Sequence, residues 1–370
     1  ASFCHLFYIN RPMKKISVSY FLLVIVCFSC DKPKNEGNKS SINRPLTIDS
    51  VAVLDETNYT LGQPASFSFI SETDFVLATK QGDISIYNLE GKRKHTFRKI
   101  GTGPLEYLDP SYISVHENKI FVWCKQLLKL VVFDLDGTPL MEYNNFSNAI
   151  RDFEIVNGKV FFYISGAASS SLIEVYDLES QRYLTELVRT DEESALLNML
   201  ACVGGLIVKD KQVYYVSSGN LAIGRIDPNS LVASKVTPIM DPEFGVEKLS
   251  LSKYEEIGNN IGLRIDFVNK NSSVGAIQTI DNLFVIRTEV GEYEYENRFD
   301  PASFDRSNRF EKYLVLDESM NLLRSYKGPI SNTSNCLIES NGKSLFSISA
   351  EETSGKGDFY YQLNRINLVN

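Results

Sequence analysis

The sequence is poor in the residues from which most catalytic and metal sites are built. It has 3 histidines, 6 cysteines and 1 tryptophan in 370 residues. His95 and His116, the two histidines beyond the amino-terminal segment, do not stand at metal-ligand spacing, and we interpret each as a surface or strand residue. The chain also lacks a Gly-x-Ser-x-Gly nucleophile elbow. The sequence therefore predicts no catalytic residue, no metal ligand and no cofactor.

Excess basic charge is lacking as well. Lys and Arg number 38 against 46 Asp and Glu, for a formal net charge of −8. No basic surface is available to gather phosphates, so we predict no nucleic-acid partner. Hydrophobic residues make up 43% of the chain and charged residues 23%, which excludes wholesale disorder. We expect a globular protein with a sizeable core, and a monomer.

The hydrophobic run near the amino terminus is too short for a membrane-spanning helix. It extends over 14 residues, from Ile16 to Ser29, behind Lys14 and Lys15, whereas a span needs about 20 residues. This pattern predicts a secretory signal that is removed. Because Met13 opens the signal, we interpret residues 1–12 as lying upstream of the native start.

The residues around the predicted cleavage point indicate a lipid anchor. Val26-Cys27-Phe28-Ser29-Cys30 is followed by a polar stretch over residues 31–41. The segment resembles a bacterial lipoprotein signal, in which the cysteine after the cleavage point carries a diacylglycerol. The resemblance implies lipidation at Cys30, a tether over residues 30–45 and attachment to the outer membrane. Cys27 and Phe28 depart from the usual residues, so ordinary secretion with a free Cys30 stays open.

Three further cysteines, Cys124, Cys202 and Cys336, are widely spaced. They form neither a disulfide framework nor a metal knuckle. We interpret each as a small buried residue in a strand, although one pair could bridge in an oxidising compartment.

A repeated phrase runs through the rest of the chain. An alternating apolar strand ends in Asp or Asn and is followed by a short turn, as at Asn88, Asp134, Asp177 and Asp227; the spacings between them are 46, 43 and 50 residues. Asp and Asn favour such corners because their side chains bond the backbone two residues on. With a further hairpin before each phrase, the pattern gives four strands per repeat, which is typical of a β-propeller blade.

We therefore predict an all-β fold, a six-bladed β-propeller with four-stranded antiparallel blades, over residues 46–370. The predicted blades are Ala65–Ile100, Tyr112–Phe146, Arg151–Val188, Gly204–Val236, Val274–Tyr326 and Cys336–Leu368. The run Leu46–Leu54 precedes them all. We expect it to complete the last blade, because pairing the chain start with the chain end removes the exposed edges.

Two insertions interrupt the repeat. Residues 190–200 carry a Thr cap, a Glu three residues later and an apolar run, which predicts a short helix. A longer insertion, residues 241–273, explains why 90 residues separate Asp227 from Asp317, and its 247–258 portion has a helix-like composition. A degenerate seventh blade in this gap is the alternative.

One apparent enzyme motif is explained by the repeat. Residues 131–140 end a strand in Asp134-Leu135-Asp136-Gly137-Thr138, which looks like the first motif of the haloacid dehalogenase phosphatases. In that family the first Asp attacks phosphorus and the second is an acid and base. The later carboxylate motif is missing, and Asn88 and Asp177 hold the same place in neighbouring repeats. We therefore predict that Asp134 is a hairpin corner.

Two other segments stand out. Glu292, Glu294 and Glu296 alternate with tyrosines, which predicts a solvated acidic edge or, alternatively, weak cation binding. The connector between the first two blades, Ile100-Gly101-Thr102-Gly103-Pro104-Leu105-Glu106-Tyr107, crosses toward the axis, where propellers commonly bind ligands. Its candidate ligand-binding residues are Gly101, Gly103, Pro104, Glu106 and Tyr107. The alternative is a rigid crossover in which Glu106 and Tyr107 bond neighbouring backbone.

Together, the lipoprotein-type signal, the six repeats and the Gly-x-Gly-Pro-x-Glu-Tyr connector resemble the six-bladed propeller lipoproteins of Gram-negative bacteria, which are related to TolB-like and NHL-repeat propellers. The resemblance implies an anchored envelope protein. We predict a binding or scaffolding module for an envelope protein, peptide or glycan, acting at the propeller face. The alternative is a metal-assisted hydrolase or lyase at the mouth of the axial channel.

Overall fold

The structure is a computed structural model. It describes residues 43–56, 60–144, 146, 150–164, 171–190, 204–217, 220–247, 250–300, 303–305, 307–330, 337–352 and 359–368. Residues 41–370 form one compact unit. The expected lipidation site, Cys30, and the expected helix over residues 190–200 lie outside the described residues, apart from residue 190.

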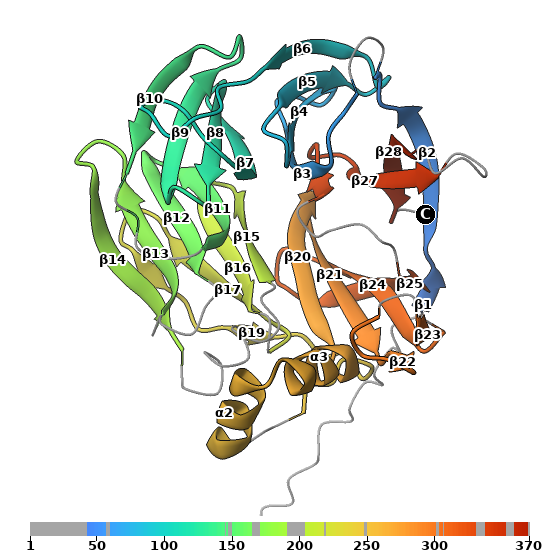
Figure 1. Ribbon diagram of the computed structural model, residues 1–370. Coiled ribbons are helices and arrows are strands. Elements are labelled where there is room, and N and C mark those ends of the chain that lie inside the picture. The colour runs from blue at the N-terminus through green and yellow to red at the C-terminus, as the bar shows by residue number, and fades with distance from the viewer. Residues whose placement is uncertain are drawn as a thin grey trace, which may run out of the picture. The chain divides into compact units, whose positions relative to one another are not determined.

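Six antiparallel sheets stand around a common axis, and each sheet is one blade (Figure 1). Blades one to three are β3 (Pro64–Phe69), β4 (Asp74–Thr79), β5 (Ile84–Asn88) and β6 (Arg93–Phe97); β7 (Pro110–His116), β8 (Lys119–Cys124), β9 (Lys129–Asp134) and β10 (Pro139–Tyr143); β11 (Ile150–Val156), β12 (Lys159–Ile164), β13 (Ser171–Asp177) and β14 (Arg182–Arg189).

Blades four to six follow the same order from the axis outward. They are β15 (Gly204–Lys209), β16 (Gln212–Ser217) and β17 (Ala222–Asp227) with the short β18 (Val232–Ala233) and β19 (Thr237–Pro238); β20 (Ser273–Ile280), β21 (Leu283–Gly291), β24 (Arg309–Leu316) and β25 (Leu322–Pro329); β26 (Ile338–Ser340), β27 (Leu345–Glu352), β28 (Phe359–Asn367) and β2 (Thr47–Val53). The predicted six-bladed propeller is confirmed.

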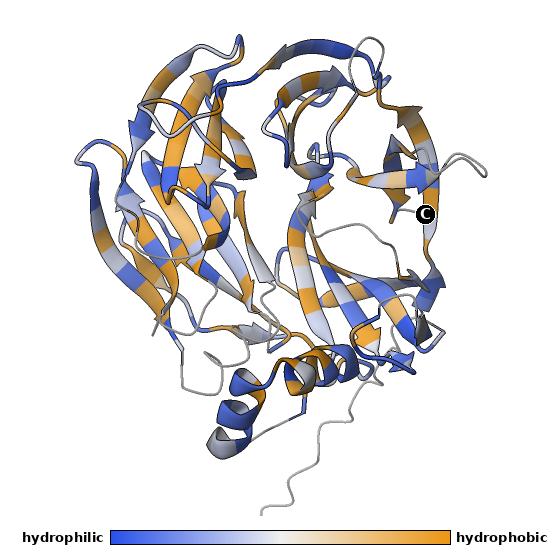
Figure 2. Ribbon diagram, in the orientation of Figure 1, coloured by the Kyte–Doolittle hydropathy of each residue, from blue (hydrophilic) through white to orange (hydrophobic). Residues whose placement is uncertain are grey.

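Strand alternation builds the core between the blades. In β8, Ile120, Val122 and Cys124 join the cluster shared with blade one, while Phe121 and Trp123 join the cluster shared with blade three. Successive side chains point to opposite faces of a sheet, so a strand that is buried on both faces is apolar throughout. One such cluster fills each of the six spaces between neighbouring blades. The apolar colouring of the strands in Figure 2 follows this arrangement.

The amino-terminal strands close the ring. As predicted, β2 pairs antiparallel with β28, from Thr47 opposite Asn367 to Val53 opposite Gln362. A further strand, β1 (Asn43–Pro45), lies parallel to β25 on the outer edge of blade five. The expected tether extends to residue 45, whereas the propeller already begins at Asn43. The chain start therefore covers the edges of two blades, because both β25 and β28 would otherwise expose unpaired backbone groups.

The aspartate corners are equivalent, as the repeat predicted. Asp134 Oδ1 accepts hydrogen bonds from the backbone N–H of Asp136 at 3.0 Å and of Thr138 at 2.7 Å, in the turn from β9 to β10. Asp227 and Asp317 accept in the same way from Asn229 and Asn321. The carboxylate of Asp134 therefore stabilises the turn between two antiparallel strands, β9 and β10. This is the hairpin corner that the repeat predicted for Asp134.

The longer insertion lies between blades four and five. The predicted helical segment contains α2 (Leu251–Asn259), and a second helix, α3 (Ile261–Lys270), follows it. The residues described between 241 and 272 include no strand, which removes the seventh-blade alternative. A hairpin of β22 (Glu294–Tyr295) and β23 (Phe304–Asp305) interrupts blade five between β21 and β24. Glu292, Glu294 and Glu296 are exposed in this hairpin, as expected of an acidic edge.

Candidate functional site

The connector between blades one and two is held by its own side chains. Tyr107 is fully buried. Its hydroxyl donates to the Gly82 carbonyl oxygen at 2.9 Å and accepts from the Lys99 N–H at 3.4 Å. Its backbone N–H donates to the Lys99 carbonyl at 3.0 Å, and its carbonyl accepts from the Gly101 N–H at 3.1 Å. Tyr107 therefore joins the two ends of the connector.

Glu106 is used in a similar way. Its Oε2 accepts from the Gly103 N–H at 2.9 Å. A Cβ on Gly101 would lie 1.9 Å from the same oxygen, so only glycine leaves room for this carboxylate. Lys129 donates to the Gly103 carbonyl at 2.9 Å. Pro104 is exposed at the turn. The structure thus brings the five predicted residues together as a braced crossover, and their contact with a ligand stays a prediction.

The axial channel is a separate site, and its residues come from all six innermost strands. A cavity of about 70 Å³ lies there, which is room for a few water molecules. Its lining includes Ser66 of β3, Tyr112 of β7, Arg151 and Asp152 of β11, Gly204 of β15, Gln278 of β20 and Glu339 of β26. Each blade contributes, so the cavity exists only when the ring is closed.

Asp152 is the best-anchored carboxylate of this channel. Its Oδ2 accepts from the Leu206 N–H of the next blade at 2.8 Å, and its Oδ1 accepts from the Phe153 N–H at 2.8 Å. Burial raises its pKa to about 7, although both hydrogen bonds act in the opposite direction. The side chain of Asp152 is partly accessible to solvent on the side that lines the channel, and protein surrounds its other sides.

Two more carboxylates share this environment. Burial, together with the charge of Asp152, raises the pKa of Glu339 to about 8. Burial also raises the pKa of Glu154 well above its ordinary value, and the charges of Asp152 and Glu339 add to this effect. Like charges in a medium of low dielectric disfavour ionisation of one another. We call Asp152, Glu154 and Glu339 the axial carboxylates.

Gln278 completes the group. Its Nε2 donates to Glu339 Oε2 at 3.2 Å and to the Ile338 carbonyl at 3.4 Å. Its Oε1 is buried and has no hydrogen-bond partner among the described residues. Exchanging the amide nitrogen and oxygen would set an acceptor against the Ile338 carbonyl, so the hydrogen bonds favour the orientation in which Nε2 points to Glu339. An unsatisfied buried acceptor of this kind costs about 1–3 kcal/mol.

Sequence reasoning missed the axial carboxylates. They lie in β11 and β26, which are about 190 residues apart in the sequence, and no short motif contains them. One signal was present: Asp152 and Glu154 alternate with apolar residues in a strand expected to lie nearest the axis. Within the described residues, no three His, Cys, Asp or Glu side chains are placed so that they could hold a metal ion.

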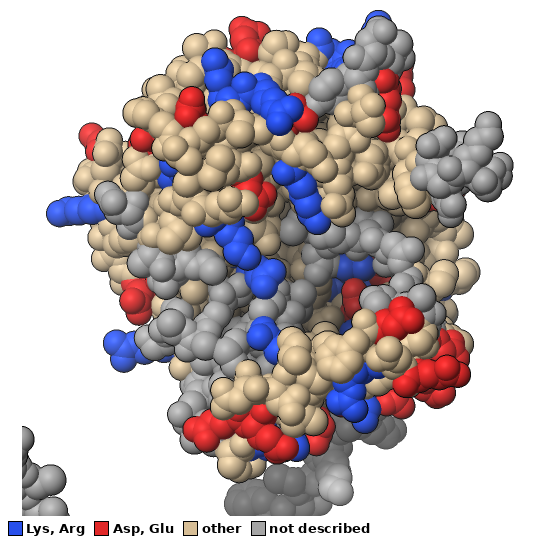
Figure 3. Space-filling view, viewed as in Figure 1, with Lys and Arg blue, Asp and Glu red and all other residues tan. Residues whose placement is uncertain are grey.

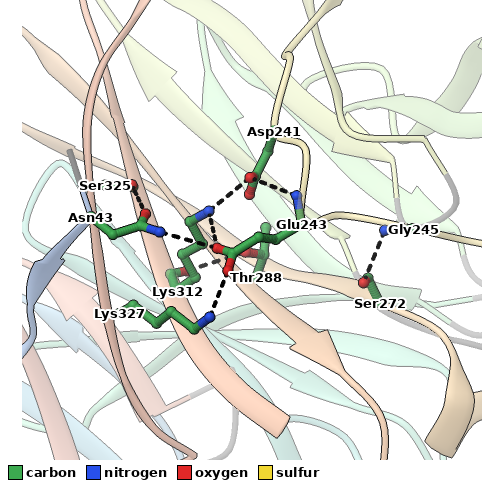
Figure 4. Close-up of polar contacts among 9 residues, drawn as sticks. All are labelled: Asn43, Asp241, Glu243, Gly245, Ser272, Thr288, Lys312, Ser325 and Lys327. Atoms are coloured by element: carbon green, nitrogen blue, oxygen red, sulfur yellow. Dashed lines mark hydrogen bonds and ion pairs between the residues drawn. The ribbon is translucent and has the colours of Figure 1, made fainter. Parts of the chain in front are cut away.

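A second concentration of buried charge lies in blade five, but there the charges are paired (Figure 4). Lys312 of β24 donates to Asp241 at 2.7 Å and to Glu243 at 2.8 Å. Lys327 of β25 donates to the other oxygen of Glu243 at 2.6 Å, and Asn43 of β1 also donates to Glu243, at 3.3 Å. These contacts fasten the start of the insertion and the first strand to blade five.

The other face of blade five holds a second set of ion pairs. Arg287 and Glu311, both buried, meet at 2.6 Å, and Tyr313 donates to the same Glu311 oxygen. Arg309 contacts Glu289 at 3.2 Å and donates to the carbonyls of Val268, Asn269 and Asn271. Arg309 thereby caps the carbonyl end of α3, where cations are favourable. On the surface, acidic side chains gather over the helices and the β22–β23 hairpin (Figure 3).

Comparisons with known proteins agree with this architecture. The model of the DUF5128 family, described as "6-bladed beta-propeller", matches residues 55–221, which is less than half of the chain. The chain has the six-bladed β-propeller fold. No curated protein matches the sequence.

Several solved structures share the fold. A member of the DUF4221 family from Bacteroides vulgatus is 13% identical, with a TM-score of 0.61, over 88% of this chain and 98% of that chain. A protein of Bacteroides fragilis is 12% identical, with a TM-score of 0.60, over 90% of this chain and 98% of that chain. U3-55K is 9% identical, with a TM-score of 0.51, over 87% and 98%. At these identities the likeness concerns the fold alone.

Proposed function

We propose that this chain is an exported binding protein of the bacterial cell envelope, anchored through a lipid on Cys30, which receives its ligand at the axial channel. The observation that carries the proposal is the cavity that all six blades line and to which five of them contribute polar side chains. Ligand sites combine a concave surface with a few convergent polar groups and titratable groups of shifted pKa. The axial carboxylates and Gln278 supply both.

The proposed location is supported by two features. The hydrophobic run over residues 16–29 and the cysteine that follows it resemble a lipoprotein signal, and the similar structure from Bacteroides fragilis is described as a "Putative exported protein". Among the described residues no helix is long and apolar enough to cross a membrane. As a partner we propose an envelope protein, peptide or glycan, in keeping with the resemblance to TolB-like and NHL-repeat propellers.

Affinity capture tests the binding proposal. The immobilised propeller, residues 41–370, is exposed to envelope extracts of the producing bacterium beside a variant carrying Asp152→Asn and Glu339→Gln. We expect the wild type to retain a species that the folded variant releases. Identical capture by the two proteins would show that the channel is not the binding site. Palmitate labelling of the full chain, with Cys30→Ser as control, tests the anchor, and an unlabelled wild type would refute it.

A further inference from the structure

The axial cavity offers hydrogen-bond acceptors on Asp152, Gln278 and Glu339, beside Ser66, Tyr112 and Arg151, which can donate. Asp152 and Glu339 line it as carboxylates, and Gln278 offers an Oε1 that nothing else in the described chain satisfies. The Nε2 of Gln278, which could donate, is already taken by Glu339 and the Ile338 carbonyl. A ligand that brings donors would therefore satisfy Gln278 Oε1 and could bond the ionised carboxylates of Asp152 and Glu339.

The charge of the site points to the same kind of ligand. The charge of Asp152 disfavours ionisation of Glu339, and the charges of Asp152 and Glu339 both disfavour ionisation of Glu154. Arg151 is the basic side chain that lines the cavity, and it is not among the groups that lower the pKa values of the axial carboxylates. A cation placed between the carboxylates would remove their repulsion, so the site favours positive charge.

We infer that the axial cavity binds a primary ammonium group, carried by a lysine side chain or by a small amine. The inference rests on the proposed function, in which this channel receives the ligand. An ammonium group has three donors, no acceptor and one positive charge, which matches the acceptors of Asp152, Glu339 and Gln278. The cavity of about 70 Å³ holds such a compact group on a narrow alkyl stem.

Binding of the ammonium group is coupled to release of protons. Asp152 and Glu339, with pKa values of about 7 and 8, hold protons near neutral pH in place of the cation. When the ammonium enters, these carboxyls lose their protons to solvent. Affinity therefore rises as the pH rises through this range and levels off above it, while the amine itself stays charged.

Calorimetric titration with two amines tests the inference. Methylammonium represents a small amine, and Nα-acetyl-lysine amide represents a side chain of a peptide; Nα-acetyl-norleucine amide is the neutral control. At about pH 9 we expect saturable binding of one or both amines and none of the control. We expect affinity to fall about tenfold or more by pH 6, with proton release visible in buffers of different ionisation enthalpy.

Matched variants separate the axial carboxylates from charge in general. Glu339→Gln and Asp152→Asn should each weaken amine binding about tenfold, whereas Glu292→Gln, at an exposed carboxylate of the β22–β23 hairpin, should leave it unchanged. Thermal melting of each variant shows that it is folded. Using two axial variants keeps the test valid if one of them fails to fold.

Three results would overturn the inference: no saturable binding of either amine at about 100 mM to the folded wild type, equal binding of the norleucine control, or saturable binding of Ca²⁺ alone that neither amine displaces. The outcome of the capture experiment tests the binding proposal independently of the amine titrations. If capture depends on Asp152 and Glu339 while neither amine binds, the channel remains the binding site and only the ammonium inference fails.

Discussion

Buried charge serves opposite purposes in blade five and at the axis. In blade five each buried cation meets a carboxylate, as Arg287 meets Glu311 at 2.6 Å and Lys312 meets Asp241 at 2.7 Å. At the axis, the charges of Asp152 and Glu339 oppose ionisation of Glu154, and the buried Gln278 Oε1 has no described partner. The first arrangement fastens an insertion and a strand to a blade. The second leaves charge and hydrogen bonding to be completed by a ligand.

The largest expected effect comes from breaking a pair in blade five. Arg287→Met leaves the carboxylate of Glu311 buried without its cation. Removing one partner of a buried pair costs about 3–5 kcal/mol, since the remaining charge stays desolvated. We expect a loss of about 3 kcal/mol in the free energy of unfolding, measured by chemical denaturation.

The control for this variant is Lys343→Met, which breaks the exposed pair of Lys343 with Glu72 and should change stability little. The double variant Arg287→Met with Glu311→Leu should recover part of the loss, because it removes the unpaired charge as well. Equal, small effects at Arg287 and Lys343 would contradict the role given to the blade-five pairs.

At the axis we expect a change of intermediate size in the free energy of unfolding, and the variant there should gain stability where Arg287→Met loses it. Burial and the charge of Asp152 raise the pKa of Glu339 to about 8, so the folded protein keeps a proton that the unfolded chain releases above its ordinary pKa of 4.5. The stability linked to this proton is complete at low pH and is lost as the pH rises through 8. Glu339→Gln should therefore stabilise the protein at about pH 9, by roughly 2 kcal/mol, and have little effect at pH 5.

Glu243→Gln gives the contrast at the ion pairs of blade five. Burial alone would raise the pKa of Glu243, but hydrogen bonds from Lys312 and Lys327 and the charges of these residues outweigh it and lower the pKa to about 2. Its contribution to stability is present above pH 4.5 and is lost as the pH falls toward 2. Glu243→Gln should thus destabilise at neutral pH. Thermal melts of both variants across pH measure this comparison, and parallel profiles would refute it.

The smallest expected effect lies in the connector. Tyr107→Phe removes the hydroxyl that bonds Gly82 and Lys99 and should lower the free energy of unfolding by about 1 kcal/mol. We expect partner capture to stay unchanged, because the hydroxyl is buried in the crossover. Weaker capture at an unchanged melting temperature, in Tyr107→Phe combined with Glu106→Ala, would instead favour ligand contact by the connector.

Much of the fold could be predicted because its signals are local. The apolar runs of strands such as β8, the corners at Asp134, Asp177 and Asp227, and the spacing between them are properties of short segments. The closure by β2 followed from the need to cover edges. The parallel strand β1 could not be predicted in the same way, because three residues carry no periodicity and their pairing with β25 depends on where the ring brings them.

The candidate site was less predictable for the same reason. The connector drew attention through its glycines, yet Glu106 and Tyr107 turn their polar atoms to neighbouring backbone. The β22–β23 hairpin was not predicted, because its residues lie inside the segment that the sequence analysis assigned to one long blade. Asp152 and Glu339 look like ordinary polar positions of separate strands, and nothing in either segment shows that the other lies across the channel.

The sequence by itself determined that this chain folds as a β-propeller and where the corners of its blades fall, because strand patterning and turn chemistry act over a few residues; the structure excluded the seventh blade. Only the tertiary structure decided which charges are paired and which are not. Burial raises the pKa values of Asp152, Glu154 and Glu339, and the charge of Asp152 adds to the shift at Glu154 and Glu339. These carboxylates come together only when the six innermost strands meet around one axis.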